Sequence, residues 1–182
     1  MYLKLKFQIS RLKELYYRIS KNGNDYARFK GVNFGENCRI YTHRFGTEPW
    51  LINIGNNVTI TSNVILLTHD GSTWLMHDKK GRRYLYRKIE IGNNVFIGIN
   101  SIIMPGVKID DDVIVAAGSI VTKSVPKGSI VAGNPAVIIG NFYNYKQKVI
   151  NDYISFNELD HQVNYRQRIE KILDPTFKNY MK

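Results

Sequence analysis

Residues 91–126 read IGNNVFIGINSIIMPGVKIDDDVIVAAGSIVTKSVP, and a branched aliphatic residue returns at every sixth position of this stretch. These positions are Ile91, Ile97, Ile103, Ile109, Val115 and Val121. Neither an α-helix, with a period of about 3.6, nor a flat amphipathic strand, with a period of about 2, sustains such a repeat. A coil of short parallel strands does, when each side of a three-sided prism takes one hexapeptide. The pattern therefore predicts an all-β solenoid, a parallel β-helix with the aliphatic side chains inside.

The same period recurs earlier in the chain, which sets the limits of the prism. Ile54, Ile60 and Leu66 repeat the step, and a weaker pair, Phe34 and Ile40, precedes them. We predict the β-helix over residues 31–139. An amphipathic N-terminal helix and a connection are expected in residues 1–30, with the helix packed against the first coils. A helical tail is expected in residues 140–182, folded back over the last coil.

Residues 69–88, HDGSTWLMHDKKGRRYLYRK, interrupt the repeat between Leu66 and Ile91. The coils of a solenoid are occupied by packing, so a loop ejected from them is where such a scaffold can place chemistry. We therefore expect functional side chains in this loop.

The amino-acid composition limits the kinds of ligand and partner that the protein is expected to bind. The 182 residues include 26 basic and 15 acidic side chains, for a net charge of +11, which favours anionic partners. The chain has no recognisable nucleic-acid-binding motif, and coenzyme A, with its three phosphates, is the simpler anionic partner. No stretch predicts a membrane span, although the amphipathic N-terminus leaves peripheral association with anionic lipid as an alternative. A single cysteine, Cys38, suits a reducing compartment, and we expect a cytoplasmic protein.

Several motifs together resemble the hexapeptide-repeat acyltransferase family, and above all its galactoside, maltose and capsular-sugar O-acetyltransferases. They are IGNNVTITSNV at 54–64, THD at 68–70, AAGSIVTK at 116–123 and AGNPA at 132–136. The resemblance implies a left-handed coil, since parallel crossovers are otherwise almost always right-handed. It also implies an acetyl-CoA-dependent O-acetyltransferase of polysaccharide biosynthesis, acting as a homotrimer on a sugar or glycan precursor, with no metal.

Transfer of an acetyl group to a hydroxyl needs a base, and a histidine is the natural one near neutral pH. His69 opens the ejected loop, in the place of the catalytic histidine of the resembling enzymes, and we predict that it is the base. By the same resemblance Asn63 contacts the acceptor sugar. Asp70 is expected either to orient the imidazole or to contact the sugar, and Trp74 offers the sugar a stacking surface. His77, in the same loop, is the second candidate for the base.

The coenzyme site is carried over from the resembling motifs. Residues assigned to it are Gly98, Ile99, Ala116, Ala117, Thr122 and Lys123. Small residues at these corners would let the thin pantetheine arm approach the backbone. One departure is that the sugar acetyltransferases often carry an arginine after the closing proline, where this chain continues with residues 136–139, AVII. The residue that would meet the coenzyme phosphates is therefore left open.

Three other functions compete with this one. The nearest is N-acetylation of an amino sugar, because the same base and coenzyme geometry serves an amine. A carbonic anhydrase of the same fold would need three histidines around zinc, whereas His69 and His77 are eight residues apart in one irregular loop. The third is a solenoid used only as a binding module, which predicts no coenzyme binding.

Overall fold

The computed structural model describes residues 12–17 and 23–180 of the chain. It divides into two compact units, Met1–Phe142 and Tyr143–Lys182. All strands of the described residues belong to the first unit. The predicted domain boundaries, at residues 30 and 139, stay predictions.

Short strands of the first unit form three sheets, and within each sheet the strands of successive coils are stacked. One sheet contains β1 (Asn33–Phe34), β3 (Ile52–Ile54), β8 (Ile89–Ile91) and β11 (Lys108–Ile109). A second contains β5 (Ile65–Leu66), β10 (Ile102–Ile103) and β13 (Ile120–Val121). The third contains β2 (Arg39–Ile40), β4 (Thr59–Ile60), β9 (Phe96–Ile97), β12 (Ile114–Val115), β14 (Ser129–Gly133) and β15 (Ala136–Asn141). Every pair in these sheets is parallel except β14–β15.

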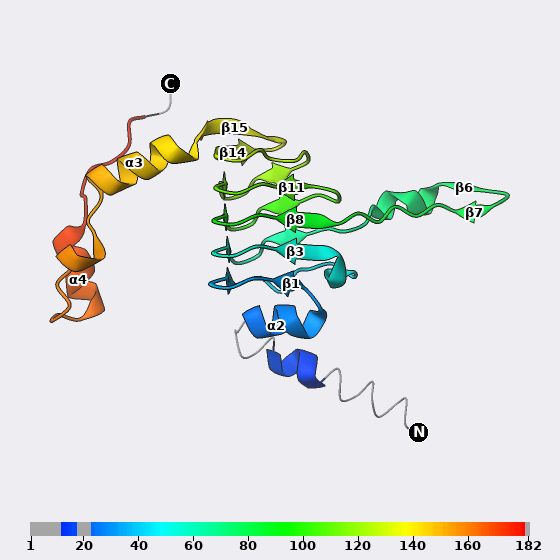
Figure 1. Cartoon of the computed structure of the whole chain (residues 1–182), viewed down its shortest axis with the longest axis horizontal. Coiled ribbons are helices and arrows are strands. Elements are labelled where there is room, and N and C mark those ends of the chain that lie inside the picture. The colour runs from blue at the N-terminus through cyan, green and yellow to red at the C-terminus, as the bar shows by residue number, and fades with distance from the viewer. Residues whose placement is uncertain (1–11, 18–22, 181–182) are drawn as a thin grey trace. The chain divides into compact units, whose positions relative to one another are not determined.

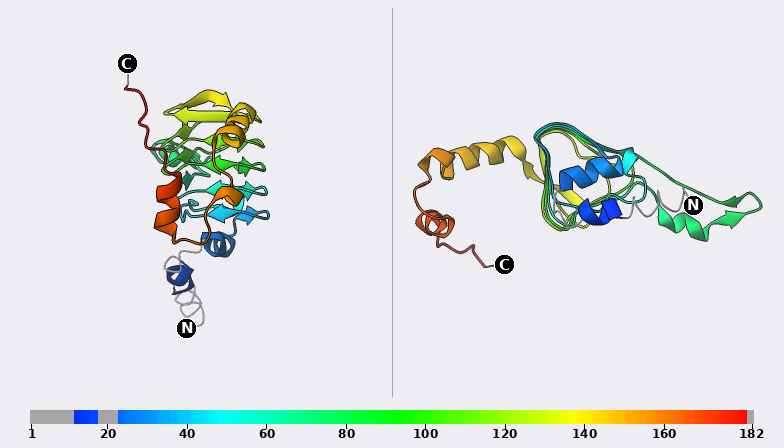
Figure 2. Two further views of the ribbon diagram at one scale, coloured as in Figure 1. Left: turned by 90° about the vertical axis from the view of Figure 1, so that its left-hand side faces the viewer. Right: turned by 90° about the horizontal axis from the view of Figure 1, so that it is seen from below.

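The chain visits the three sheets in rotation, for example from β8 to β9 to β10 and then to β11. Figure 1 shows β1, β3, β8 and β11 stacked, and the right-hand view of Figure 2 looks along the stack, where the coils superpose in one outline. The prediction of short parallel strands stacked by a six-residue repeat is confirmed. The left hand of the coil stays a prediction.

The aliphatic repeat forms the core. Ile60 pairs with Ile97, and Ile97 pairs with Val115 on the next coil; all three side chains are fully buried. The other two sheets follow the same register, through Ile54–Ile91–Ile109 and Leu66–Ile103–Val121. Each buried aliphatic side chain contributes roughly 1.5–3 kcal/mol relative to exposure. One row of side chains per sheet therefore holds the coils in register.

Asparagine and aspartate shape one edge of the prism. Asn57, Asn94 and Asp112 all have φ between 55° and 58°, in the left-handed region that these short polar residues tolerate. The Asn57 amide donates to Asn94, and the Asn94 amide donates to Asp112, each at 3.1 Å. The bonded residues are 18 positions apart at the second bond but 37 at the first, because an insertion leaves the coil between β5 and β8. This insertion contains the ejected loop predicted from the sequence.

Helix α2 (Gly23–Lys30) covers the first coil. The Asn24 amide donates to the Cys38 carbonyl at 2.7 Å, and its oxygen accepts from the Ile40 N–H at 2.9 Å. Most of the predicted N-terminal helix lies outside the described residues, but residues 12–17 are helical. There the Tyr17 ring lies 5.1 Å from the Phe29 ring of α2, so this turn contacts α2.

The second unit contains the 3-10 helix η3 (Phe156–Glu158) and α4 (Tyr165–Ile172), and α3 (Phe142–Asp152) begins at the boundary. The predicted place of this tail over the last coil stays a prediction. No helix of the described residues combines the length and apolar character that crossing a bilayer requires.

Candidate active site

His69 lies three residues after β5, at the base of the long insertion. It forms an isolated antiparallel bridge with Tyr86, so the two ends of the insertion meet at this histidine. Its side chain is 35% exposed, so solvent reaches part of it. A histidine held at the base of a projecting loop can be reached by a ligand.

The structure gives His69 a partner that the sequence did not suggest. Glu48 precedes the 3-10 helix η1 (Pro49–Leu51), and its Oε2 lies 2.9 Å from the Nδ1 of His69. The same oxygen accepts from the Thr68 hydroxyl at 2.7 Å, and Oε1 accepts from the Thr47 hydroxyl at 2.5 Å. The Glu48 side chain is only 14% exposed. Two threonines therefore fix a largely buried carboxylate against the imidazole.

Electrostatics keep this carboxylate charged. Burial raises the pKa of the Glu48 carboxyl, but hydrogen bonds from Thr47, Thr68 and His69 outweigh burial and hold that pKa below its ordinary value. An ionised carboxylate can only accept hydrogen bonds, so the Nδ1 of His69 carries the proton of this bond. In the neutral ring, Nε2 is then an acceptor, which is the state that a general base requires.

Asp70 has a different partner. Its carboxylate accepts from the Ser72 hydroxyl at 2.7 Å and from the Ser72 N–H at 2.9 Å, and it caps the 3-10 helix η2 (Gly71–Leu75). The hydrogen bond from the Ser72 hydroxyl lowers the pKa of Asp70 most, and the bond from the Ser72 N–H lowers it further. Of the two roles expected for Asp70, orientation of the imidazole thus belongs to Glu48 in this geometry. Contact of Asp70 with a sugar stays a prediction.

Residues 69–88, which we call the arm, project from the stack and end in the hairpin of β6 (His77–Asp78) and β7 (Gly81–Arg82) (Figure 1). Trp74 is 62% exposed, and its role as a stacking surface for a sugar stays a prediction. His77 contacts the edge of Trp74, with ring centres 5.8 Å apart. Among the described residues, no three or more histidine, cysteine or acidic side chains gather as a metal site would require.

The predicted ligand contacts fall on two edges of the prism. Turns between the β4–β9–β12 sheet and the β5–β10–β13 sheet carry Asn63, Gly98, Ile99, Ala116 and Ala117. The next edge, past β5 and β13, carries His69, Asp70, Thr122 and Lys123. A whole face of the prism separates the two groups within one chain.

At the first edge, Ala116 and Ala117 differ in their hydrogen bonds and in their exposure. The Ala116 carbonyl accepts from the hydroxyls of Ser101 and Ser119 at 3.1 and 2.6 Å, and its N–H donates to Val131. Ala117 is exposed on the turn, beside Gly118, whose missing Cβ would face open space. Ala117 is therefore the better placed of the two to meet a ligand.

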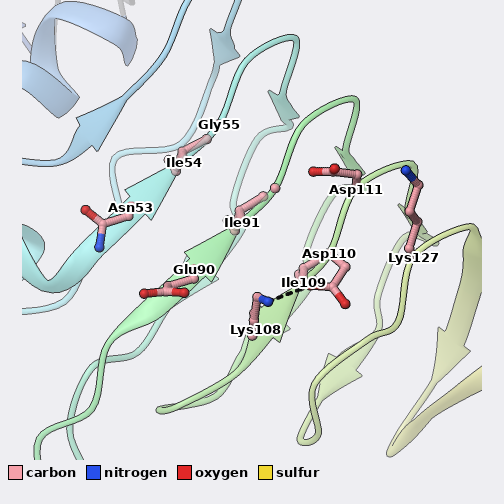
Figure 3. Close-up of a pocket in the computed structure, with 11 residues that line it drawn as sticks. Asn53, Ile54, Gly55, Glu90, Ile91, Lys108, Ile109, Asp110, Asp111 and Lys127 are labelled. Atoms are coloured by element: carbon pink, nitrogen blue, oxygen red, sulfur yellow. Dashed lines mark ion pairs between the residues drawn. The ribbon is translucent and has the colours of Figure 1, made fainter.

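Two hollows lie away from His69. One of about 560 Å³ runs along β3, β8 and β11 (Figure 3), where Lys108 pairs with Asp110 at 2.9 Å. Glu90, Asp110, Asp111 and Lys127 also line it, so acidic and basic side chains are mixed there. The other, of about 380 Å³, includes Thr122 and Lys123. The larger hollow contains none of the predicted site residues, and we give it less weight than the polar geometry around His69.

Comparison with known proteins agrees with this architecture. Residues 88–123 match the family described as bacterial transferase hexapeptide (six repeats). Protein CapG of Staphylococcus aureus is 45% identical over 157 residues, which cover 81% of this chain and 91% of CapG. Galactoside O-acetyltransferase of Escherichia coli strain K12 is 36% identical over 108 residues, covering 59% of this chain but only 53% of the enzyme.

Among solved structures, galactoside acetyltransferase in complex with coenzyme A is similar with a TM-score of 0.50 and 24% identity, covering 82% of this chain and 87% of that chain. At this identity the likeness concerns the fold alone.

Proposed function

Because this chain belongs to the hexapeptide-repeat acyltransferase family, we propose that it moves an acetyl group from acetyl-CoA to a hydroxyl of a sugar or glycan precursor. The observation that carries the proposal is the hydrogen bond of His69 to the partly buried Glu48 carboxylate at the base of the exposed arm. By analogy with the family, we propose a left-handed coil. We place the protein in the cytoplasm, since its single cysteine suits a reducing compartment.

The chemistry proposed is direct transfer. His69 Nε2 takes the hydroxyl proton while the acceptor oxygen bonds to the thioester carbonyl carbon. The carbon–sulfur bond then breaks, and His69 returns the proton to the departing sulfur. Glu48 holds the ring and stabilises its positive charge between the two proton transfers. Cys38 is buried, so we assign it no part as a nucleophile.

The working unit proposed is a homotrimer with each site between two prisms. The proposed base lies on a different edge of the chain from four of the proposed coenzyme contacts, Gly98, Ile99, Ala116 and Ala117. Closed three-fold packing would bring the His69 edge of one subunit to the Ala117 edge of the next. Within such a seam, acetyl-CoA would run along Gly98, Ile99, Ala116 and Ala117 and extend toward Thr122 and Lys123. Asn63 and Asp70 would contact the acceptor, and Trp74 would stack on it.

The test is release of coenzyme A thiol from acetyl-CoA across a panel of sugars, sugar nucleotides and amino sugars. We expect acceptor-dependent release, lowered by roughly 10²–10⁴-fold in His69→Ala. His77→Ala tests the second candidate base, and His161→Ala, in the second unit, is the matched control. Release with amino sugars alone would support N-acetylation instead, and equal activity of His69→Ala and wild type would refute the assignment of the base.

A further inference from the structure

A continuous row of rings and one guanidinium leads away from His69 along the arm. The ring centres of His69 and Tyr86 are 6.0 Å apart, and Tyr86 and Tyr84 are stacked with centres 6.2 Å apart and planes within 8°. The Arg82 guanidinium lies 4.6 Å from the centre of Tyr84 and 4.9 Å from the centre of Trp74. We call these five residues the ladder.

The backbone explains why the ladder is continuous. Residues 82, 84 and 86 alternate between the end of β7 and the bridge at Tyr86, and their contacts show that the three side chains lie on the same side. Four residues of extended chain span roughly 13 Å, which is longer than a single sugar ring. The three aromatic rings beyond His69 are more than half exposed, at 62% for Trp74, 62% for Tyr84 and 52% for Tyr86. The ladder therefore offers a strip that several linked sugars could cover.

The positive charge of Arg82 favours one class of ligand. Arg83 pairs with Asp78, whereas no carboxylate of the described residues lies within ion-pair distance of Arg82. The Nε of Arg82 is buried without a hydrogen-bond partner, and the two flanking rings hold this side chain. A planar guanidinium held in this way suits a carboxylate or phosphate, which it can bind through two parallel hydrogen bonds.

We propose that the ladder docks an acidic oligosaccharide, so that the acceptor is one sugar of a linked, carboxylate- or phosphate-bearing glycan rather than a free neutral monosaccharide. The inference rests on the proposed function, because it places one hydroxyl of that glycan at His69. A second copy of the chain is the alternative occupant of this strip, and the accessibility of Trp74 to a quencher distinguishes it from a glycan.

Trp74 can report the binding directly. The chain has two tryptophans, so Trp50→Phe leaves Trp74 as the one fluorescent indole. This protein is titrated with a uronic acid tetrasaccharide, its carboxyl-reduced neutral counterpart, a singly phosphorylated neutral tetrasaccharide and the free uronic acid. We expect the two acidic tetrasaccharides to bind about tenfold or more tightly than the neutral one and the monosaccharide. The carboxylate and phosphate arms show which acid the ladder prefers.

Variants in the same background locate the contact. Arg82→Gln should remove the preference for acid, so that acidic and neutral tetrasaccharides bind alike, and Tyr84→Ala should weaken binding of both. Lys79→Gln removes the same charge from the exposed hairpin tip and should leave the preference intact. Equal binding of acidic and neutral chains, or equal effects of Arg82→Gln and Lys79→Gln, would overturn the inference. So would an unliganded Trp74 that acrylamide cannot quench, because a second copy would then cover the ladder.

Acetyl transfer is measured separately, so that the two proposals can fail independently. Arg82-dependent glycan binding without any acetyl transfer would refute the proposed function and leave the ladder as an acidic-glycan site. Transfer to the acidic tetrasaccharides at the same rate in Arg82→Gln and wild type would refute the ladder and leave the proposed function.

Discussion

The Nδ1 of His69 and the Oε2 of Glu48 lie 2.9 Å apart although 21 residues separate them in the chain. Each residue belongs to a connection that leads back to the β1–β3–β8–β11 sheet, Glu48 before β3 and His69 before β8. The six-residue repeat stacks these two connections on adjacent coils. The regular core therefore determines a contact between two irregular segments.

Glu48→Gln should lower kcat by about 10²-fold while the affinity for coenzyme A stays nearly constant. The amide keeps the shape of the carboxylate but loses its charge and can present an N–H to Nδ1, which favours the wrong tautomer of His69. Steady-state kinetics with the best acceptor of the panel measures the effect. The double variant with His69→Ala should be little worse than His69→Ala alone, and fully additive losses would mean that Glu48 acts elsewhere.

The lowered pKa of Glu48 predicts how its contribution to stability depends on pH. A carboxyl with a lower pKa in the folded than in the unfolded chain stabilises the fold above its ordinary pKa of 4.5, and this contribution is lost as the pH falls below that value. Denaturant unfolding of wild type and Glu48→Gln should therefore differ more at about pH 7 than at about pH 3. A difference that grows on acidification would contradict the charged state assigned to Glu48.

The coils could be predicted because the repeat assigns each position a place. The aliphatic residue of each hexapeptide lies inside, and small or polar residues lie at the turns. Ile97 and Ile103 could be placed on neighbouring sheets from their spacing alone. The position of Glu48 could not be predicted in this way. It lies in the aperiodic stretch YTHRFGTEPW at 41–50, where no repeat indicates which way a side chain points. The only signal was an acidic residue next to a proline that begins a short helix, which is common in turns.

The hydrogen bonds of Asp70 could be predicted in part from the sequence. An aspartate two residues before a serine is a common cap, and the structure uses it in that way. Its position beside His69 instead suggested either an orienting role or a contact with the sugar. Sequence adjacency misleads here, because two side chains that are neighbours in an extended segment point in opposite directions.

Gly98 should tolerate alanine less well than Gly118 does. A Cβ on Gly98 would lie 2.4 Å from the Ala117 nitrogen on the next coil, so backbone has to move, at a cost of roughly 1–3 kcal/mol. A Cβ on Gly118 meets nothing within 4 Å, and the strain comes only from its φ of +71°, at roughly 1–2 kcal/mol. Denaturant unfolding of Gly98→Ala and Gly118→Ala compares the two costs, and the reverse order would argue against this close approach of the coils.

Ala117→Leu should abolish coenzyme A binding and leave the prism folded. Ala117 is exposed on a turn, so a larger side chain there extends outward into the proposed path of the pantetheine arm without disturbing the core. Calorimetric titration with coenzyme A gives the affinity, and circular dichroism checks the fold. Lys127→Leu, on an exposed lysine that pairs with Asp112 at another edge, is the control for added apolar surface. Full affinity in a folded Ala117→Leu protein would move the coenzyme to a different edge.

Subunits that carry His69→Ala should restore activity to subunits that carry Ala117→Leu when the two are refolded together. In a cyclic trimer whose sites lie at the seams, every mixed trimer has one seam that joins an intact His69 edge to an intact Ala117 edge. Equal mixing makes about three quarters of the trimers mixed, with one working site of three, so recovery should approach about a quarter of the wild-type rate. Each variant refolded alone is the baseline. Recovery no greater than that baseline, in trimers whose mixed composition is verified by mass, would mean that base and coenzyme meet within one chain.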